Sequence, residues 1–286
     1  MKIVIYGLAK SGTSALFYKI RNSLPAGTIT LFEPKAYTIS GRIMGRARAL
    51  WRRNLTPDVL AKVLPWEKGP VRLGDFERFD RQILIVRDPR DRIVSGLLYR
   101  SFNARFVRGE AAALEWLRLL RRKESEPGSI SMLELVEAFD AMERAAGVQS
   151  HWVDRYQENG VTRPLRFHNE RPHLHVFRYE QLIEERFEDL EAFLGIRLAG
   201  SATVPPLLGR VVRTKGSGAW RHWFTPEDVE AFRPMFQPYL DHYYPAADWG
   251  LGAPGSLDPE LGSRYVERVI NEKRALWGLL PLSSAS

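Results

Sequence analysis

Short apolar segments alternate with longer amphipathic ones along most of this chain. The run KIVIY at 2–6 is apolar, rich in β-branched residues and followed by a glycine, which predicts a buried strand. Further strands are predicted within the segments 28–33, 69–76, 81–91 and 173–182. Strands that alternate with helices are typical of a parallel sheet covered on both faces. The pattern therefore predicts an α/β fold with a mostly parallel central sheet flanked by helices.

Helices are predicted between and after these strands. Asp88 followed by Pro89 is a typical helix start, an N-cap with proline at the first helical position. The other helices are predicted at 13–23, within 41–64 from a start at 56–58, across 110–160 with a break at 126–129, from the last strand to about 194, and near 263–279. The tail from about residue 246 carries Gly, Pro and Ser before its helix. We therefore interpret 1–245 as one domain and 246–286 as a C-terminal appendage.

The composition favours an anionic ligand. The 286 residues include 42 Lys and Arg against 34 Asp and Glu, a net charge of +8, and most of the basic residues are arginines, which suit phosphate and sulfate groups. No RNP, zinc-finger or helix-turn-helix motif supports a nucleic acid partner. The absence of cysteine excludes disulfides, cysteine-ligated zinc and thiol nucleophiles. No long apolar run or secretion signal is present, so we expect no membrane span and a cytoplasmic location.

A glycine loop, GLAKSGTS at 7–14, links the first predicted strand to the first predicted helix. Such a loop cradles phosphate, because backbone N–H groups and the positive end of the helix face the anion. A nucleoside triphosphate loop reads G-x-x-x-x-G-K-[ST]. Here Thr13 follows the second glycine, Gly12, and the only lysine of the loop, Lys10, precedes it. Thr13 and Ser14 add hydroxyl groups, so the loop predicts an anion site that differs from a triphosphate site.

Two segments resemble the sulfotransferases that use 3′-phosphoadenosine 5′-phosphosulfate (PAPS). GLAKSGTSAL resembles their 5′-phosphosulfate loop, with Ala9 in place of the usual proline. LIVRDPRDRIVSGLLY at 84–99 resembles their second motif, R-x-P-x-D-x-x-x-S, and matches it at Arg87 and Ser95. A strand-end arginine and a serine two helical turns later can converge on one phosphate, which in this family is the 3′-phosphate. An ion pair between Arg87 and Asp91 is the structural alternative.

Two later segments extend the resemblance. RTKGSGAWRHWFT at 213–225 is similar to the family's late loop, in which a basic residue, here Arg213 or Lys215, reaches the 3′-phosphate. VFRYEQL is similar to the segment that places a tyrosine, here Tyr179, near the adenine. Ala15 stands where many members have an aromatic residue after the first loop.

The resemblance is to bacterial-type members, nearer the carbohydrate sulfotransferases, and implies a P-loop-NTPase-like sulfotransferase fold. It also implies PAPS as donor, adenosine 3′,5′-bisphosphate (PAP) as product and no required metal. The residues it assigns to the donor are Lys10, Ser11, Gly12, Thr13, Ser14, Arg87, Ser95, Tyr179, Arg213, Lys215 and Gly216. Because a sulfuryl donor carries less charge at the transferred group than a triphosphate, Lys10 alone can stabilise the leaving phosphate.

Glu33 is the candidate general base. Glycan- and tyrosine-sulfating relatives use a glutamate some twenty-odd residues after the loop lysine, and Glu33 comes 23 residues after Lys10. It ends the second predicted strand in an F-x-E-P stretch similar to that of carbohydrate sulfotransferases, and strand ends are where open α/β sheets form their site. A turn cap before Pro34 or an ion pair with Lys35 is the structural alternative. The other base candidates are Glu67, Asp75 and His151.

Several alternatives stay open at this point. A P-loop kinase would use ILIVRD as a Walker-B strand with Asp88 on Mg²⁺, although the Walker lysine is missing. A non-catalytic phosphonucleotide-binding module would keep the loop without turnover. The acceptor hydroxyl is expected on a glycan or a small molecule, with a lipid also open. His173 and His175 alternate on a strand and are interpreted as structural.

Overall fold

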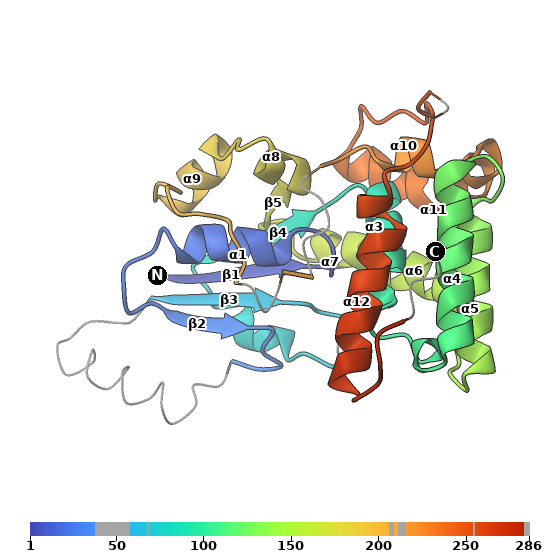
Figure 1. Cartoon of the computed structure of the whole chain (residues 1–286). Coiled ribbons are helices and arrows are strands. Elements are labelled where there is room, and N and C mark those ends of the chain that lie inside the picture. Colours follow the sequence, from blue (N-terminus) through green and yellow to red (C-terminus); the bar gives the residue numbers. More distant parts are fainter. Residues whose placement is uncertain (38–57, 68, 206–208, 211–215, 254, 283–286) are drawn as a thin grey trace. The chain divides into compact units, whose positions relative to one another are not determined.

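The computed structural model describes residues 1–37, 58–67, 69–205, 209–210, 216–253 and 255–282. Contacts divide the chain into two compact units, whose elements are labelled in Figure 1. The first unit comprises Met1–Arg87 and Pro164–Leu207, and the second comprises Asp88–Arg163 and Leu208–Ser286. Among the described residues, no helix combines the length and the apolar composition needed to cross a membrane.

The described part of the first unit contains a five-stranded sheet in the order β2-β3-β1-β4-β5, and all its neighbouring strands run parallel (Figure 1). The strands are β1 (Lys2–Gly7), β2 (Ile29–Phe32), β3 (Val59–Val63), β4 (Arg81–Val86) and β5 (His175–Arg178). The three central strands are almost entirely buried, as expected for a parallel sheet covered on both faces. The predicted α/β fold with a mostly parallel central sheet flanked by helices is confirmed.

Helices cover both faces of this sheet. Helix α1 (Thr13–Arg21) packs against β1 and β3, and Lys62 of β3 donates a hydrogen bond to it. Tyr6 lies one position further along the paired strand β1, so its side chain points to the opposite face. There its ring meets Phe167 of α7 (Arg163–Asn169) edge-on, with centroids 5.1 Å apart.

Strand β3 corrects the prediction of a helix from a start at 56–58. Val59–Val63 are all buried and lie between β1 and β2. The leucine, alanine and lysine of this segment favour a helix locally, but pairing on both sides and burial decide for a strand. The rest of the predicted helical segment, residues 38–57, lies outside the described residues.

Two further predictions in the first unit were wrong. The segment 69–76 contains no strand among its described residues, and Leu73–Phe76 form a 3₁₀ turn, η1, because the Gly-Asp pair interrupts the apolar pattern. The helix predicted to run to about 194 is two helices, α8 (Tyr179–Ile183) and α9 (Glu188–Leu194). Glu185 lies between them at φ 55°, a left-handed conformation that a helix cannot include.

The described part of the second unit consists of helices and loops. Its helices are α3 (Pro89–Arg100), α4 (Glu110–Ser125), α5 (Met132–Ala145), α6 (Trp152–Gln157), α10 (Trp220–Trp223), α11 (Pro226–Tyr243) and α12 (Ser263–Leu276), with shorter turns η2 (Phe106–Arg108), η3 (Glu158–Thr162) and η5 (Pro259–Leu261). The predicted start of α3 is confirmed, since the Asp88 side chain accepts a hydrogen bond of 2.9 Å from the N–H of Arg90. The break at 126–129 and the helix near 263–279 are also confirmed.

The C-terminal helix α12 packs against α3 and α4. The buried carboxylate of Glu124 accepts hydrogen bonds from both the N–H and the hydroxyl of Ser263, the latter at 2.7 Å. Arg274, also buried, donates to the carbonyl oxygen of Val107 at 2.9 Å. The predicted boundary at residue 246 therefore falls inside the second unit, and the division into a domain 1–245 and an appendage 246–286 stays a prediction.

Candidate active site

The glycine loop connects β1 to α1 and ends at the N-terminus of that helix. Gly12 is the N-cap of α1 and has φ 82°, a left-handed conformation that favours glycine. No side chain caps this helix, and its first turn contains no acidic residue. The first N–H groups of a helix have no partner within the helix and carry its positive partial charge. The end of α1 therefore has the backbone and the electrostatics of an anion site.

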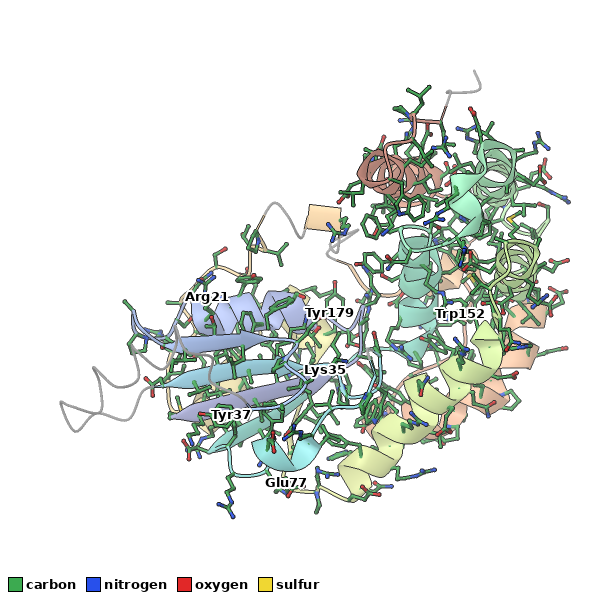
Figure 2. The ribbon with its side chains drawn as sticks, turned by 90° about the horizontal axis from the view of Figure 1, so that it is seen from below. Arg21, Lys35, Tyr37, Glu77, Trp152 and Tyr179 are labelled. Carbon is green, nitrogen blue, oxygen red and sulfur yellow. The ribbon has the colours of Figure 1, made fainter. Side chains whose placement is uncertain are left out.

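Gly12, the second glycine of the loop, packs closely against Tyr179 at the start of α8. A Cβ atom added to Gly12 would lie 2.4 Å from Cδ2 of Tyr179. Figure 2 labels Tyr179 at the N-terminal end of α1 and Arg21 at its other end. The ring of Tyr179 thus packs directly on the loop, which only glycine allows at this position.

Arg87 joins the loop to the end of β4. Its Nη1 donates a hydrogen bond of 2.8 Å to the carbonyl oxygen of Lys10, and the centre of its guanidinium lies 4.3 Å from the centroid of the Tyr179 ring. Lys10 itself has φ 67°, which is unusual for a residue with a side chain. The structure therefore brings Lys10, Gly12, Arg87 and Tyr179, which come from separate sequence motifs, together in the first unit.

The three loop hydroxyl residues, Ser11, Thr13 and Ser14, are all buried. Ser14 Oγ accepts a hydrogen bond of 2.9 Å from Nζ of Lys62. A hydroxyl group that accepts in this way still carries a hydrogen that it can donate. Ser14 therefore connects the loop to a cation that comes from the sheet.

Glu33 lies directly after β2 and is bound by Lys62. Its Oε1 accepts a hydrogen bond of 2.8 Å from Lys62 Nζ, and its N–H donates to the Lys62 carbonyl oxygen, also at 2.8 Å. The Nζ of Lys35, the partner considered from the sequence, lies 3.5 Å from the Gly69 carbonyl oxygen. Lys62 was missed because its segment was predicted to be helical, although a lysine within an otherwise apolar run is a signal for a paired charge.

Two other carboxylates considered as bases have structural partners. Glu67 accepts a hydrogen bond from the N–H of Ala9 and so supports the loop. Asp75 accepts from the N–H of Tyr37 at 3.0 Å. Both contacts are typical of turns that are held by a carboxylate.

Of the three histidines considered from the sequence, His175 has a packing contact in the structure. His175 stacks on Phe193 with ring centroids 4.5 Å apart, and burial lowers the pKa of its imidazole. His173 is exposed just before β5. His151, the remaining base candidate, is exposed at the start of α6 in the second unit.

The later motif residues belong to the second unit. Ser95 is buried in α3. Asp91, also in α3, accepts hydrogen bonds from the N–H groups of Gly218 at 2.5 Å and Trp220 at 3.0 Å. This ties the late loop to the helix that carries Ser95 and gives Asp91 a role other than an ion pair with Arg87. Gly216 is partly buried, and the remaining two predicted residues, Arg213 and Lys215, lie outside the described residues.

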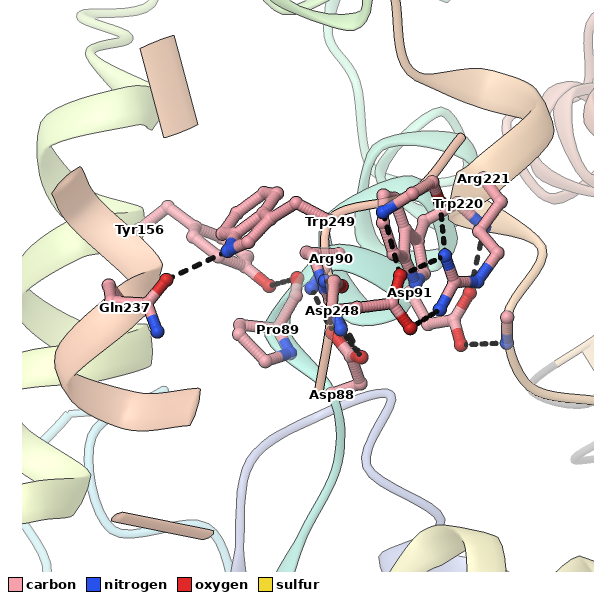
Figure 3. A network of polar contacts seen from close by, with 12 residues as sticks. Asp88, Pro89, Arg90, Asp91, Tyr156, Trp220, Arg221, Gln237, Asp248 and Trp249 are labelled. Atoms are coloured by element: carbon pink, nitrogen blue, oxygen red, sulfur yellow. Dashed lines mark hydrogen bonds and ion pairs between the residues drawn. The ribbon is translucent and has the colours of Figure 1, made fainter. Parts of the chain in front are cut away.

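A network of charges and tryptophans surrounds the start of α3 (Figure 3). Arg90 is buried, and its guanidinium lies 3.9 Å from the ring centroid of Trp220 and 4.8 Å from that of Trp249. It binds the Asp88 carboxylate through Nε at 2.9 Å and Nη2 at 2.6 Å. Asp88, the metal ligand required by a kinase, is thus already neutralised by a bidentate arginine, which argues against that function.

The same network fastens the tail onto α10. Arg221 binds Asp248 through two hydrogen bonds of 2.7 and 2.8 Å, and these hold the pKa of the Asp248 carboxyl well below its usual range. The backbone of Asp248 in turn accepts from Arg90. The tail therefore contributes to the packing around the start of α3.

Comparisons with known proteins find similarity among solved structures alone. No family model and no curated protein matches the chain. Among the solved structures that match is mouse sulfotransferase SULT7A1 complexed with PAP, with a TM-score of 0.42 and 19% sequence identity over 85% of this chain and 86% of that one. A likeness of this degree does not decide between functions.

Proposed function

We propose that this protein is a PAPS-dependent sulfotransferase. The observation that carries the proposal is the contact between Arg87 and Lys10, with Tyr179 against both Arg87 and Gly12. The family uses one motif for the 5′-phosphosulfate of its donor and another for the 3′-phosphate. Here the first motif follows β1 and the second follows β4, and Arg87 and Lys10 bring the two into contact at one edge of the sheet. A P-loop kinase requires a lysine after the second glycine and a carboxylate for Mg²⁺. In this chain Thr13 follows the second glycine, and the Asp88 carboxylate is bound by Arg90.

The chain's own residues supply what a bisphosphate nucleotide requires. The N–H groups at the start of α1, with Ser11, Gly12, Thr13 and Ser14, would hold the 5′ end, because they combine donors with positive partial charge. Arg87 would bind the 3′-phosphate with its planar fork of donors. Tyr179 would lie near the adenine. Ser95, Arg213, Lys215 and Gly216 are assigned to the same donor by their sequence motifs alone.

When bound, PAPS supplies the sulfuryl group, and Lys10 and Glu33 carry the protein's part of the chemistry. Lys10 places an ammonium group at the loop, where it stabilises the negative charge that develops on the leaving phosphate. Glu33 takes the proton of the acceptor hydroxyl. The Lys62 ammonium, 2.8 Å away, holds the Glu33 carboxylate in one orientation, which a base requires.

The acceptor is proposed to be a hydroxyl group of a glycan or small molecule. Support comes from Glu33 followed by Pro34 and from the absence of any histidine before His151, since the glycan-sulfating relatives use a glutamate. A lipid hydroxyl is the remaining class of acceptor to be screened.

The proposal is tested in two steps. Calorimetry in the presence of EDTA should show that PAP binds far more tightly than AMP, because only PAP carries the 3′-phosphate. Equal affinities would overturn the assignment of Arg87. A screen of glycans, phenols, alcohols and lipids with PAPS labelled in its sulfate should then reveal transfer, whereas tight PAP binding with no transfer to any of them would favour a non-catalytic binding module.

A further inference from the structure

Lys62 is a buried cation in β3, which lies between β2 and β1. Its side chain is only 2% exposed, although it is charged and lies in a strand whose other residues are apolar. A buried ammonium is costly unless hydrogen bonds and an opposite charge compensate it. Lys62 has such compensation from Ser14, from Glu33 and from the ring of Phe32, whose centroid lies 3.9 Å from Nζ.

The two hydrogen-bond partners of this cation belong to the two halves of the proposed chemistry. Ser14 is in the phosphate loop at the start of α1, and Glu33 is the proposed base after β2. Both hydrogen bonds are made by the same nitrogen atom, at 2.9 and 2.8 Å.

Lys62 also fixes the backbone of Glu33. The Glu33 N–H donates to the Lys62 carbonyl oxygen, which extends the pairing of Phe32 beside Lys62 by one residue. Glu33 has φ 54°, so its chain leaves the strand in a strained conformation. Backbone pairing and the ion pair together therefore hold the carboxylate in one direction, which is what a base requires.

We propose that Lys62 is a positioning residue that couples the phosphate loop to the general base. This inference rests on the proposed function. Lys62 acts on turnover through Glu33, because it orients the carboxylate. It acts on donor binding through Ser14, because it holds the Ser14 oxygen so that the hydroxyl hydrogen points to the bound anion. It does not itself contact the transferred group.

The test begins with Lys62→Met, which keeps the length of the buried stem and removes the charge. Turnover should fall roughly 10–100-fold, the range for residues that orient a functional group, and PAP affinity should fall less than about tenfold. Lys35→Met is the matched control, since Lys35 is a nearby lysine that stays outside both contacts. Its kcat and PAP affinity should equal those of the unchanged protein. Equal values for Lys62→Met as well would overturn the inference.

Two background variants distinguish a positioning residue from a direct one. In a Glu33→Gln protein, Lys62→Met should lower kcat by less than about twofold further, because its route to the reaction is already lost. In a Ser14→Ala protein, Lys62→Met should leave PAP affinity unchanged for the same reason. Effects that multiply in the Glu33→Gln background would mean that Lys62 acts directly on the donor, and the inference would be wrong.

A double variant serves as the control for loss of stability. Lys62→Met leaves the Glu33 carboxylate without its cation, so this variant alone can be less stable. The double variant Lys62→Met/Glu33→Gln removes both charges, and its melting temperature should return towards that of the unchanged protein while its kcat stays at the Glu33→Gln level. If the unchanged protein fails to bind PAP, the proposed function fails. If it binds PAP and transfers sulfate but the backgrounds behave independently, only the role of Lys62 fails.

Discussion

Nη1 of Arg87 donates a hydrogen bond of 2.8 Å to the carbonyl oxygen of Lys10, across 77 positions of the chain. Arg87 directly follows β4, the strand next to β1, and Lys10 is in the loop that leaves β1. The parallel pairing of the two strands therefore brings these residues to one edge of the sheet. The arginine thereby supports a loop residue with φ 67° while its guanidinium lies on the ring of Tyr179. One contact thus links the shape of the phosphate loop to the residue proposed for the 3′-phosphate.

Replacing Arg87 tests both parts of that relationship. Arg87→Ala should weaken PAP binding by on the order of 2–4 kcal/mol, because a buried charge-assisted contact is lost. AMP binding should weaken much less, through the loop alone. Arg21→Ala, at the far end of α1, removes a similar charge and should leave both affinities unchanged. Calorimetry with PAP and AMP measures the difference, and an equal loss for the two nucleotides would place Arg87 with the loop only.

Gly12→Ala should damage both the fold and the site. An alanine at position 12 would have a positive φ, and its Cβ would lie 2.4 Å from the Tyr179 ring. Gly27→Ala is the matched control, because Gly27 also has a positive φ, 103°, but an added Cβ there would have no atom within 4 Å. Both substitutions cost the left-handed conformation, and Gly12→Ala should cost about 1–3 kcal/mol more through the steric overlap. Urea unfolding of the two variants gives this difference. PAP affinity should fall for Gly12→Ala only, and equal stability of the two variants would contradict the packing of Tyr179 on the loop.

Lys10 and Glu33 should differ in their effects on binding and turnover. Glu33→Gln keeps the size and a hydrogen-bonding oxygen for Lys62 but removes the base, so turnover should fall by roughly 10²–10⁴-fold with PAP affinity nearly unchanged. Lys10→Ala should also lose turnover, with a modest loss of PAP affinity. Higher pH should partly rescue Glu33→Gln with an acidic phenol acceptor and should not rescue Lys10→Ala. Near-normal turnover of Glu33→Gln would move the base to Glu67, Asp75 or His151.

Lys123 should make the stability of the protein depend on pH in the alkaline range. It is fully buried in α4, its Nζ donates to the carbonyl oxygens of Pro127 and Ile130, and burial lowers its pKa from 10.5 to about 8. Between these values the unfolded chain binds a proton that the folded chain has released, so stability rises with pH, by up to roughly 1.4 kcal/mol per pH unit. The cost of the buried charge is fully present below about pH 8.

The measurement compares the free energy of unfolding of the unchanged protein with that of Lys123→Met from pH 7 to 10. The difference should stay constant up to about pH 8 and should then increase in favour of the unchanged protein, because methionine does not titrate. Tyrosines and other groups titrate in both proteins and cancel. A difference that does not change with pH would contradict the lowered pKa.

The sequence alone determined the parts of the site that are local in the chain. The loop at 7–14 could be predicted because its donors are consecutive residues between one strand and one helix, and the start of α3 because Asp88 and Pro89 act within a single turn. The parallel α/β fold followed from the alternation of buried strands with helices, since that pattern needs helices on both faces. Periodicity and caps are properties of short segments, so they can be recognised without the fold.

Tertiary structure decided what depends on distant contacts. β3 is a strand because β1 and β2 pair with it on both sides and bury it, which outweighs its local preference for a helix. The same pairing places Lys62 beside Glu33 and under Ser14, 29 and 48 positions away, and no pattern in the sequence connects these three residues. The hydrogen bond from the Ala9 N–H to Glu67 and the packing of Tyr179 against Gly12 also join residues that no sequence pattern connects. A buried charge finds its partners only when the sheet assembles, because burial itself makes the pairing necessary.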